Sequence, residues 1–224
     1  FKVFLWLDKS SMWNGCHCWD NNVLNNIKNN FISIKIYVKL KMKLIIIMIF
    51  TSMIFSETYK EPNFTLLKKD GSIEIRQYEK YVIAKTSIPL DGKDDNNMFR
   101  TLASYIFGGN ENNESIPMTA PVTTYQDNDK YNMVFYMLDA DSVTDMPATN
   151  NQDIVFEEFE MGKCAVISFS WFTTDTRINH YKDKLSTYLN KNKITPKSTY
   201  MVNRYDPPWR MPFMRRNEIL VKIN

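Results

Sequence analysis

Residues 73–107 read IEIRQYEKYVIAKTSIPLDGKDDNNMFRTLASYIF, a pattern of two strands followed by one helix. Apolar and polar side chains alternate over Ile73–Arg76, as they do in a half-buried strand. Tyr81–Ile88 is rich in β-branched and aromatic residues, so we predict that it is the hairpin partner of that strand. Carboxylates at Asp94-Asp95 suit the free amides of a helix start, and apolar residues at helical spacing predict a helix over Asn96–Phe107.

This order of elements recurs in the second half of the chain. Two more strands are predicted after the first helix, at Ile116–Tyr125 and Tyr131–Leu138. A hairpin, a helix and two strands then follow, at Ile154–Phe159, Lys163–Phe172, Thr174–Lys191, Thr199–Tyr205 and Glu218–Ile223. Two β-β-α-β-β units predict a duplicated, pseudo-twofold sheet or barrel. We assign it to the α+β class because hairpins imply antiparallel pairing.

The N-terminal part of the chain has a different character. Residues 1–41 are crowded with Asn, Lys and Ile and show no sustained period, so we predict a non-native or untranslated leader. Residues 42–56 have the layout of a signal peptide, with Lys43 before the apolar run Leu44–Phe55 and a small residue at Ser56. A membrane anchor, which needs about 20 apolar residues, and a buried strand are the alternatives.

The predicted mature chain, residues 57–224, is one domain, since no Pro- or Gly-rich linker divides it. The whole chain carries a net charge of +3, whereas residues 57–224 hold 21 basic and 23 acidic residues, a net charge of −2. Neither value indicates a nucleic-acid surface. A hydrophobic content of 44% argues against disorder. We expect no stable membrane span after signal cleavage.

Catalytic and metal-binding signatures are scarce. The Cys16-His17-Cys18 cluster lies in the predicted leader, and its spacing differs from that of zinc sites. Residues 57–224 contain one His and one Cys, too few for most catalytic triads or metal sites. His180 falls on the polar face of its helix, and Cys164 lies in an apolar strand as a buried thiol would. We therefore expect a protein that is not an enzyme.

Four motifs together identify a family resemblance. They are IEIRQY at 73–78, SIPMTAPV at 115–122, NRYDPPW at 203–209 and RRNE at 215–218. In this order and spacing they resemble the SOUL/p22 haem-binding protein family, from about Phe64 to Asn224. The resemblance implies a distorted antiparallel β-barrel flanked by two helices. It also implies non-enzymatic binding of haem or a related tetrapyrrole, without an obligatory axial ligand.

The resemblance further implies a shallow apolar groove beside the first helix of the domain. Its floor would be Met98, Phe99, Leu102, Ala103 and Ile106. Tyr205 and Phe213 would form another wall, and Arg100 would hold the propionates, with Arg204 and Lys197 as further candidates. The alternatives are that the helical face is ordinary core and that the cations are solvated surface charges.

Other features bear on localisation and structure. Asn63 and Asn113 stand in glycosylation sequons, which fit a secreted glycoprotein and predict surface positions. Arg215, Arg216 and Glu218 are predicted to form ion pairs around the last strand. The favoured function is a secreted haem carrier or scavenger. The alternative is a secreted module that binds another apolar small molecule or a protein partner.

Overall fold

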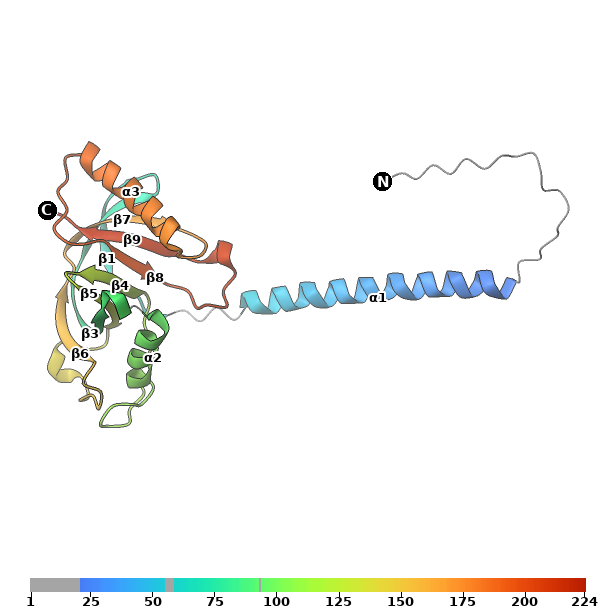
Figure 1. Ribbon diagram of the computed structural model, residues 1–224, viewed down its shortest axis with the longest axis horizontal. Coiled ribbons are helices and arrows are strands. Elements are labelled where there is room, and N and C mark those ends of the chain that lie inside the picture. The colour runs from blue at the N-terminus through green and yellow to red at the C-terminus, as the bar shows by residue number, and fades with distance from the viewer. Residues whose placement is uncertain (1–20, 55–58, 93) are drawn as a thin grey trace. The chain divides into compact units, whose positions relative to one another are not determined.

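The computed structural model describes residues 21–54, 59–92 and 94–224, which form two separate compact units (Figure 1). The described part of the first unit is one helix, α1 (Asn21–Ile54), which runs from the predicted leader into the apolar stretch. Among the described residues, no helix combines the length and the apolar character needed to span a membrane. The Cys16-His17-Cys18 cluster and Ser56 lie outside the described residues, and the leader and signal peptide stay predictions.

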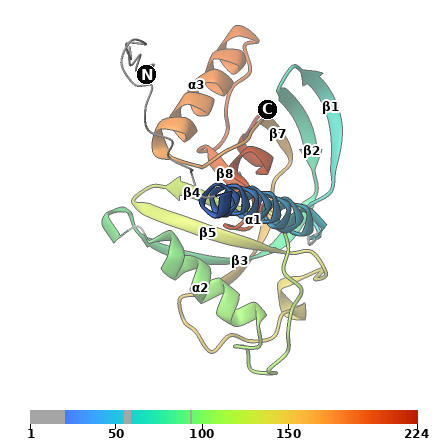
Figure 2. The same ribbon diagram turned by 90° about the vertical axis from the view of Figure 1, so that its right-hand side faces the viewer.

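The second unit, Tyr59–Asn224, is an α+β structure built on one curled antiparallel sheet. Helices α2 (Asp95–Ile106) and α3 (Asp175–Lys191) pack on the same face of the sheet, each over a different half of it (Figures 1 and 2). The strand order is β1-β2-β7-β9-β8-β4-β5-β3-β6. The strands are β1 (Phe64–Asp70), β2 (Ile73–Tyr78), β3 (Lys80–Pro89), β4 (Val122–Asp127), β5 (Lys130–Met137), β6 (Val155–Glu160), β7 (Lys163–Phe169), β8 (Met201–Arg204) and β9 (Asn217–Lys222).

Two of the predicted hairpins are wrong. β2 pairs with β1 and β7, not with β3, and β6 pairs with β3, not with β7. The reason is that β2 and β3 form one long bent strand, and β6 and β7 form a second one. Only Glu79 separates β2 from β3, and the pairing register continues across the bend, since Gln77 lies opposite Lys163 and Lys80 lies opposite Glu160. These two bent strands run along each other and curl the sheet.

The remaining pairings agree with the antiparallel prediction. β4 pairs with β5 across the turn at 128–129, and β8 pairs with β9. β4 and β8 pair with each other and join the two halves of the sheet. The first strand of each predicted unit thus pairs with the second strand of the other unit. The internal duplication itself stays a prediction.

Both predicted helices form within one residue of their predicted limits, but one strand was missed and three strands, β4, β7 and β8, are shorter than predicted. β1 was not predicted. All seven of its residues are exposed, so neither face of the strand needs apolar side chains, and the sequence lacks the alternation that identifies a half-buried strand. The predicted strand at Ile116–Tyr125 begins only at Val122. Pro117 and Pro121 lack the amide hydrogen that a central ladder needs, which delays pairing until after the second proline.

Three hydrophobic clusters hold the second unit together. One lies between α2 and β3 and β5, and includes Leu102, Val82 and Phe135. A second lies between α3 and β7 and β9, around Leu185. The third fills the concave interior of the sheet. All three clusters lie within residues 73–223, so residues 57–224 contain a complete core and are expected to fold without the preceding segment.

Candidate functional site

Helix α2 is held at both ends and along one face. The Asp94 side chain accepts hydrogen bonds from the backbone amides of Asn96 and Asn97, each at 3.1 Å, which caps the helix start. Five side chains on the inner face are buried: Met98, Leu102, Ala103, Tyr105 and Ile106. The Tyr105 hydroxyl donates to the carbonyl oxygen of Pro147 at 2.7 Å, and burial raises its pKa to about 12. The helix is therefore fixed against the sheet.

Four of the five residues predicted to form the groove floor belong to the core. Met98, Leu102, Ala103 and Ile106 are each at most 8% exposed and pack against β3 and β5. A helix that covers a sheet needs such an apolar stripe, and here the stripe is fully used for that purpose. The alternative of an ordinary core face, left open by the sequence, describes these four positions in this structure. A ligand could contact them only if α2 moved away from the sheet.

The other two predicted residues on α2 face outward. Phe99 is 37% exposed, and its ring meets the ring of Phe135 at a centroid distance of 5.4 Å. Arg100 follows it and is exposed. An aromatic ring beside a guanidinium suits a flat macrocycle with carboxylate substituents. On α2, Phe99 and Arg100 are thus the predicted site residues that a ligand can reach without rearrangement.

The predicted second wall lies on the loop between β8 and β9. The Tyr205 hydroxyl donates to Glu218 at 2.7 Å, and burial raises the pKa of Tyr205 well above its usual value. Phe213 is exposed on a short 3-10 helix, Pro212–Met214. Arg204, next to Tyr205, reaches Asp95 at the start of α2 with a nitrogen–oxygen distance of 3.5 Å. The structure therefore connects this loop to the start of α2 but gives Tyr205 a structural partner.

The weaker propionate candidates are poorly suited to a carboxylate ligand. Arg204 donates to Thr173 at 3.0 Å and to Thr124 at 2.9 Å, and Asp95 beside it would repel an anion. One oxygen of Asp95 is buried and has no hydrogen-bond partner, so this spot favours a donor over another acceptor. Lys197 lies next to β9, because its amide donates to the carbonyl oxygen of Lys222. Arg100 is the better candidate.

Sequence reasoning missed a buried polar network that joins three of the four motifs. The Arg76 guanidinium binds both oxygens of Glu218, each at 3.0 Å. Glu218 also accepts from Tyr205 and from Ser168. Two of the three residues of the RRNE motif that were predicted to form ion pairs do so: Glu218 pairs with Arg76, and Arg216 pairs with Glu61. The alternation of apolar and polar residues in β2 could have indicated that Arg76 points into the sheet interior. Its partner Glu218 lies on β9, far along the chain, and could not be identified from the sequence.

The one His and the one Cys of the second unit lie on α3 and β7, outside α2 and the β8–β9 loop. His180 is exposed on α3, as predicted, and α3 covers the half of the sheet that α2 does not. Cys164 is completely buried, as predicted, and desolvation raises its pKa to about 12. Within the described part of the chain, no three His, Cys, Asp or Glu side chains are grouped to bind a metal ion.

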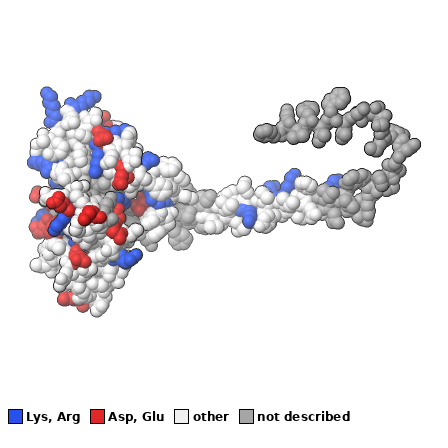
Figure 3. Space-filling view, viewed as in Figure 1, with Lys and Arg blue, Asp and Glu red and all other residues white. Residues whose placement is uncertain are grey.

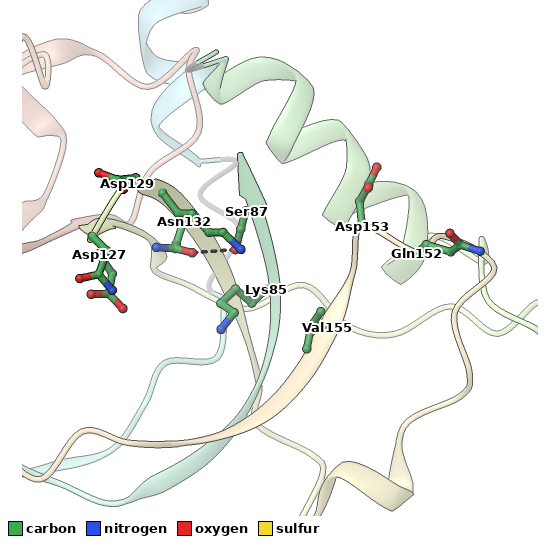
Figure 4. Close-up of a pocket in the computed structure, with 10 residues that line it drawn as sticks. Lys85, Ser87, Asp127, Asp129, Asn132, Gln152, Asp153 and Val155 are labelled. Atoms are coloured by element: carbon green, nitrogen blue, oxygen red, sulfur yellow. Dashed lines mark hydrogen bonds between the residues drawn. The ribbon is translucent and has the colours of Figure 1, made fainter. Parts of the chain in front are cut away.

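A separate cleft of about 600 Å³ lies at the β4–β5 turn and the start of β6 (Figure 4). Asp127, Asp129 and Asp153 line it together with Lys85, and Ser87 donates to Asn132 at 2.6 Å across it. None of the predicted site residues lines this cleft. Its charged, hydrophilic walls are unsuited to an apolar macrocycle.

The fold of the second unit is similar to solved structures of low sequence identity. A hydrolase encoded by lin2189 from Listeria innocua matches with a TM-score of 0.51 and 9% identity, over 70% of this chain and 94% of that chain. The EcmrR C-terminal domain matches with a TM-score of 0.51 and 12% identity, over 68% and 96% of the two chains. At this identity the likeness shows the fold alone.

Sequence comparison assigns the family. No curated protein matches this chain. Residues 59–222, nearly the whole second unit, match the family described as SOUL heme-binding protein. The match covers the curled sheet, both flanking helices and all four motifs, and the chain therefore belongs to the SOUL heme-binding protein family.

Proposed function

We propose that the second unit binds haem or a related tetrapyrrole without catalysing a reaction, and acts as a carrier or scavenger. The observation that carries this proposal is the family match over residues 59–222. The outer face of α2 supports it, because Phe99 offers an exposed ring and Arg100 an exposed cation for a propionate. Phe213 offers a further exposed ring on the β8–β9 loop.

The buried stripe of α2 changes how the site should be tested. An aspartate at Met98 or Leu102 would place a charge in the core, so such a variant would unfold whether or not it binds haem. Phe99→Asp changes an exposed position instead. Phe107→Asp is a matched control, because Phe107 is a more exposed phenylalanine just beyond the other end of the same helix.

The test is a haem titration of residues 57–224 followed by the Soret band. We expect a saturable shift at about one haem per chain, a loss of roughly tenfold in affinity for Phe99→Asp, and wild-type affinity for Phe107→Asp. A flat titration of the wild-type domain would sink the proposal. Binding of other apolar molecules with none of haem would instead favour the alternative function, a binding module for another ligand.

We also propose that the protein enters the secretory pathway and is glycosylated. Asn63 and Asn113, the acceptors of the two sequons, are both exposed, as an acceptor must be. Expression of residues 42–224, which begin with the predicted signal peptide, in a eukaryotic cell should yield a product in the medium whose mass falls on enzymatic deglycosylation. Retention of an unmodified product in the cytosol would contradict this proposal.

A further inference from the structure

An exposed cluster of four aromatic residues and one methionine, which we call the aromatic tip, lies on the β7–α3 loop and the β8–β9 loop of the second unit. Its members are Trp171, Phe172, Trp209, Met211 and Phe213, and between 41% and 78% of the surface of each residue is exposed. Apolar side chains gathered at one surface site mark an interaction surface, whereas scattered ones need no explanation. The surface near the Pro212–Met214 helix is mostly white, with basic atoms at its margin (Figures 1 and 3).

The two loops of the aromatic tip are bonded to each other. The Trp171 amide donates to the carbonyl oxygen of Pro212 at 2.8 Å. The Arg215 guanidinium lies over the Phe172 ring at 4.8 Å and donates to the carbonyl oxygen of Arg210 at 2.9 Å. The exposed rings are therefore presented together by a connected backbone.

The backbone at Trp171 is strained, and its side chain is exposed. Its φ of +79° lies in the left-handed region, which a bulky aromatic residue rarely adopts. The Asn217 side chain donates to the carbonyl oxygen of Trp171 at 2.8 Å and helps to hold this conformation. Strain of this kind persists where the surrounding structure enforces it, and it is concentrated at functional sites.

The charge around the aromatic tip is positive although residues 57–224 are acidic as a whole. The β8–β9 loop, residues 205–216, contains three arginines and one aspartate. Arg210 pairs with that residue, Asp206, at 3.0 Å. Arg216, at the end of the same loop, pairs with Glu61, whereas Arg215 lies over the Phe172 ring within the aromatic tip. Basic side chains next to exposed aromatic rings complement a surface that has an apolar interior and anionic groups at its boundary.

We propose that the aromatic tip docks the domain on a phospholipid surface. Trp and Phe settle at the boundary between headgroups and acyl chains, and nearby arginines bind phosphate groups. Binding is peripheral, with the side chains of two loops inserted and the sheet outside the bilayer. Phe213 belongs to both proposed sites, but Trp171 and Trp209, the two residues changed in the test below, are not among the haem-contact residues, so the lipid proposal does not rest on haem binding.

Residues 57–224 carry their own probe, because Trp171 and Trp209 are the only tryptophans in that range. With vesicles of phosphatidylcholine and phosphatidylserine, we expect the domain to float with the lipid and its tryptophan emission to shift to shorter wavelength. Brominated phosphatidylcholine should quench that emission. Binding should weaken when phosphatidylserine is left out or salt is raised. Flotation without quenching would mean that another face binds, and would overturn the proposal.

The matched variants are Trp171→Asn with Trp209→Ser, and Phe107→Ser as the control. Asn accepts the left-handed conformation, so the double variant should keep its fold, which circular dichroism checks. It should lose vesicle affinity by about tenfold or more, whereas Phe107→Ser, at an exposed phenylalanine outside the aromatic tip, should bind as the wild type does. Absence of binding by the wild type would overturn the proposal, as would an equal loss in the control. So would a wild-type dimer that the double variant abolishes, because the occupant would then be a second copy.

Discussion

Arg76 and Glu218 form an ion pair inside the second unit, with both side chains almost completely removed from water. Each partner is satisfied by further bonds, Arg76 to Glu74 and Tyr78 and Glu218 to Tyr205 and Ser168. Such a pair adds little stability over an apolar substitute, but the loss of one partner leaves a charge buried alone. Arg76, Tyr205 and Glu218, one from each of three motifs, thus form a polar network inside the curled sheet.

Removing one partner of this pair should cost more than removing both. We expect Glu218→Leu to lower the free energy of unfolding by about 3–5 kcal/mol, because Arg76 is then buried without a counter-charge. Arg76→Met together with Glu218→Leu should recover much of that loss. Urea unfolding of the two variants and the wild type measures this. Equal losses of unfolding free energy in the single and double variants would show that the unpaired charge of Arg76 is not the cause of the destabilisation.

Cys164 should be inert in the folded protein. Burial raises the pKa of its thiol to about 12, so the reactive thiolate is absent at about pH 8. A thiol reagent such as DTNB should label residues 57–224 only when urea is added. The unfolded thiol ionises near pH 8.5 while the folded one stays protonated, so stability falls as the pH rises above that value. Rapid labelling without urea would contradict the buried position.

At the scale of elements, the two helices and the β4–β5 hairpin could be predicted, whereas the pairing of β2, β3, β6 and β7 could not. Capping at Asp94 and Thr174 and the apolar period are local signals, and they fixed both helices within one residue. A bend at Glu79 looks like a hairpin turn in sequence, because only the partner strand shows that the register continues. The floor of the predicted groove could not be distinguished from core for a similar reason. An amphipathic helix has the same apolar face in its sequence whether a ligand or a sheet covers that face.

The inner and outer faces of α2 should therefore respond differently to substitution. Leu102→Ala should lower the free energy of unfolding by about 3 kcal/mol, since it opens a cavity in the core. Arg100→Ala, at an exposed position on the same helix, should change it by less than about 0.5 kcal/mol. Chemical denaturation of both variants tests this. Similar effects at the two positions would mean that α2 is not packed as described.

The whole molecule comprises a SOUL-family domain and a helix that precedes it in the chain. Residues 59–222 contain the family match, and the domain has its own three hydrophobic clusters. Haem binding is proposed for the outer face of α2 and lipid docking for the aromatic tip. Each site uses exposed aromatic rings beside arginine, and each can be disabled without touching the core.

The most direct test of haem binding by apolar contact compares haem with iron-free protoporphyrin IX by calorimetric titration of residues 57–224. If apolar contact and a propionate at Arg100 supply the affinity, both molecules should bind at about one per chain with dissociation constants within about threefold of each other. No saturable binding of either molecule would contradict the proposed function. Binding of haem alone would show that a ligand to iron carries the affinity, contrary to this account.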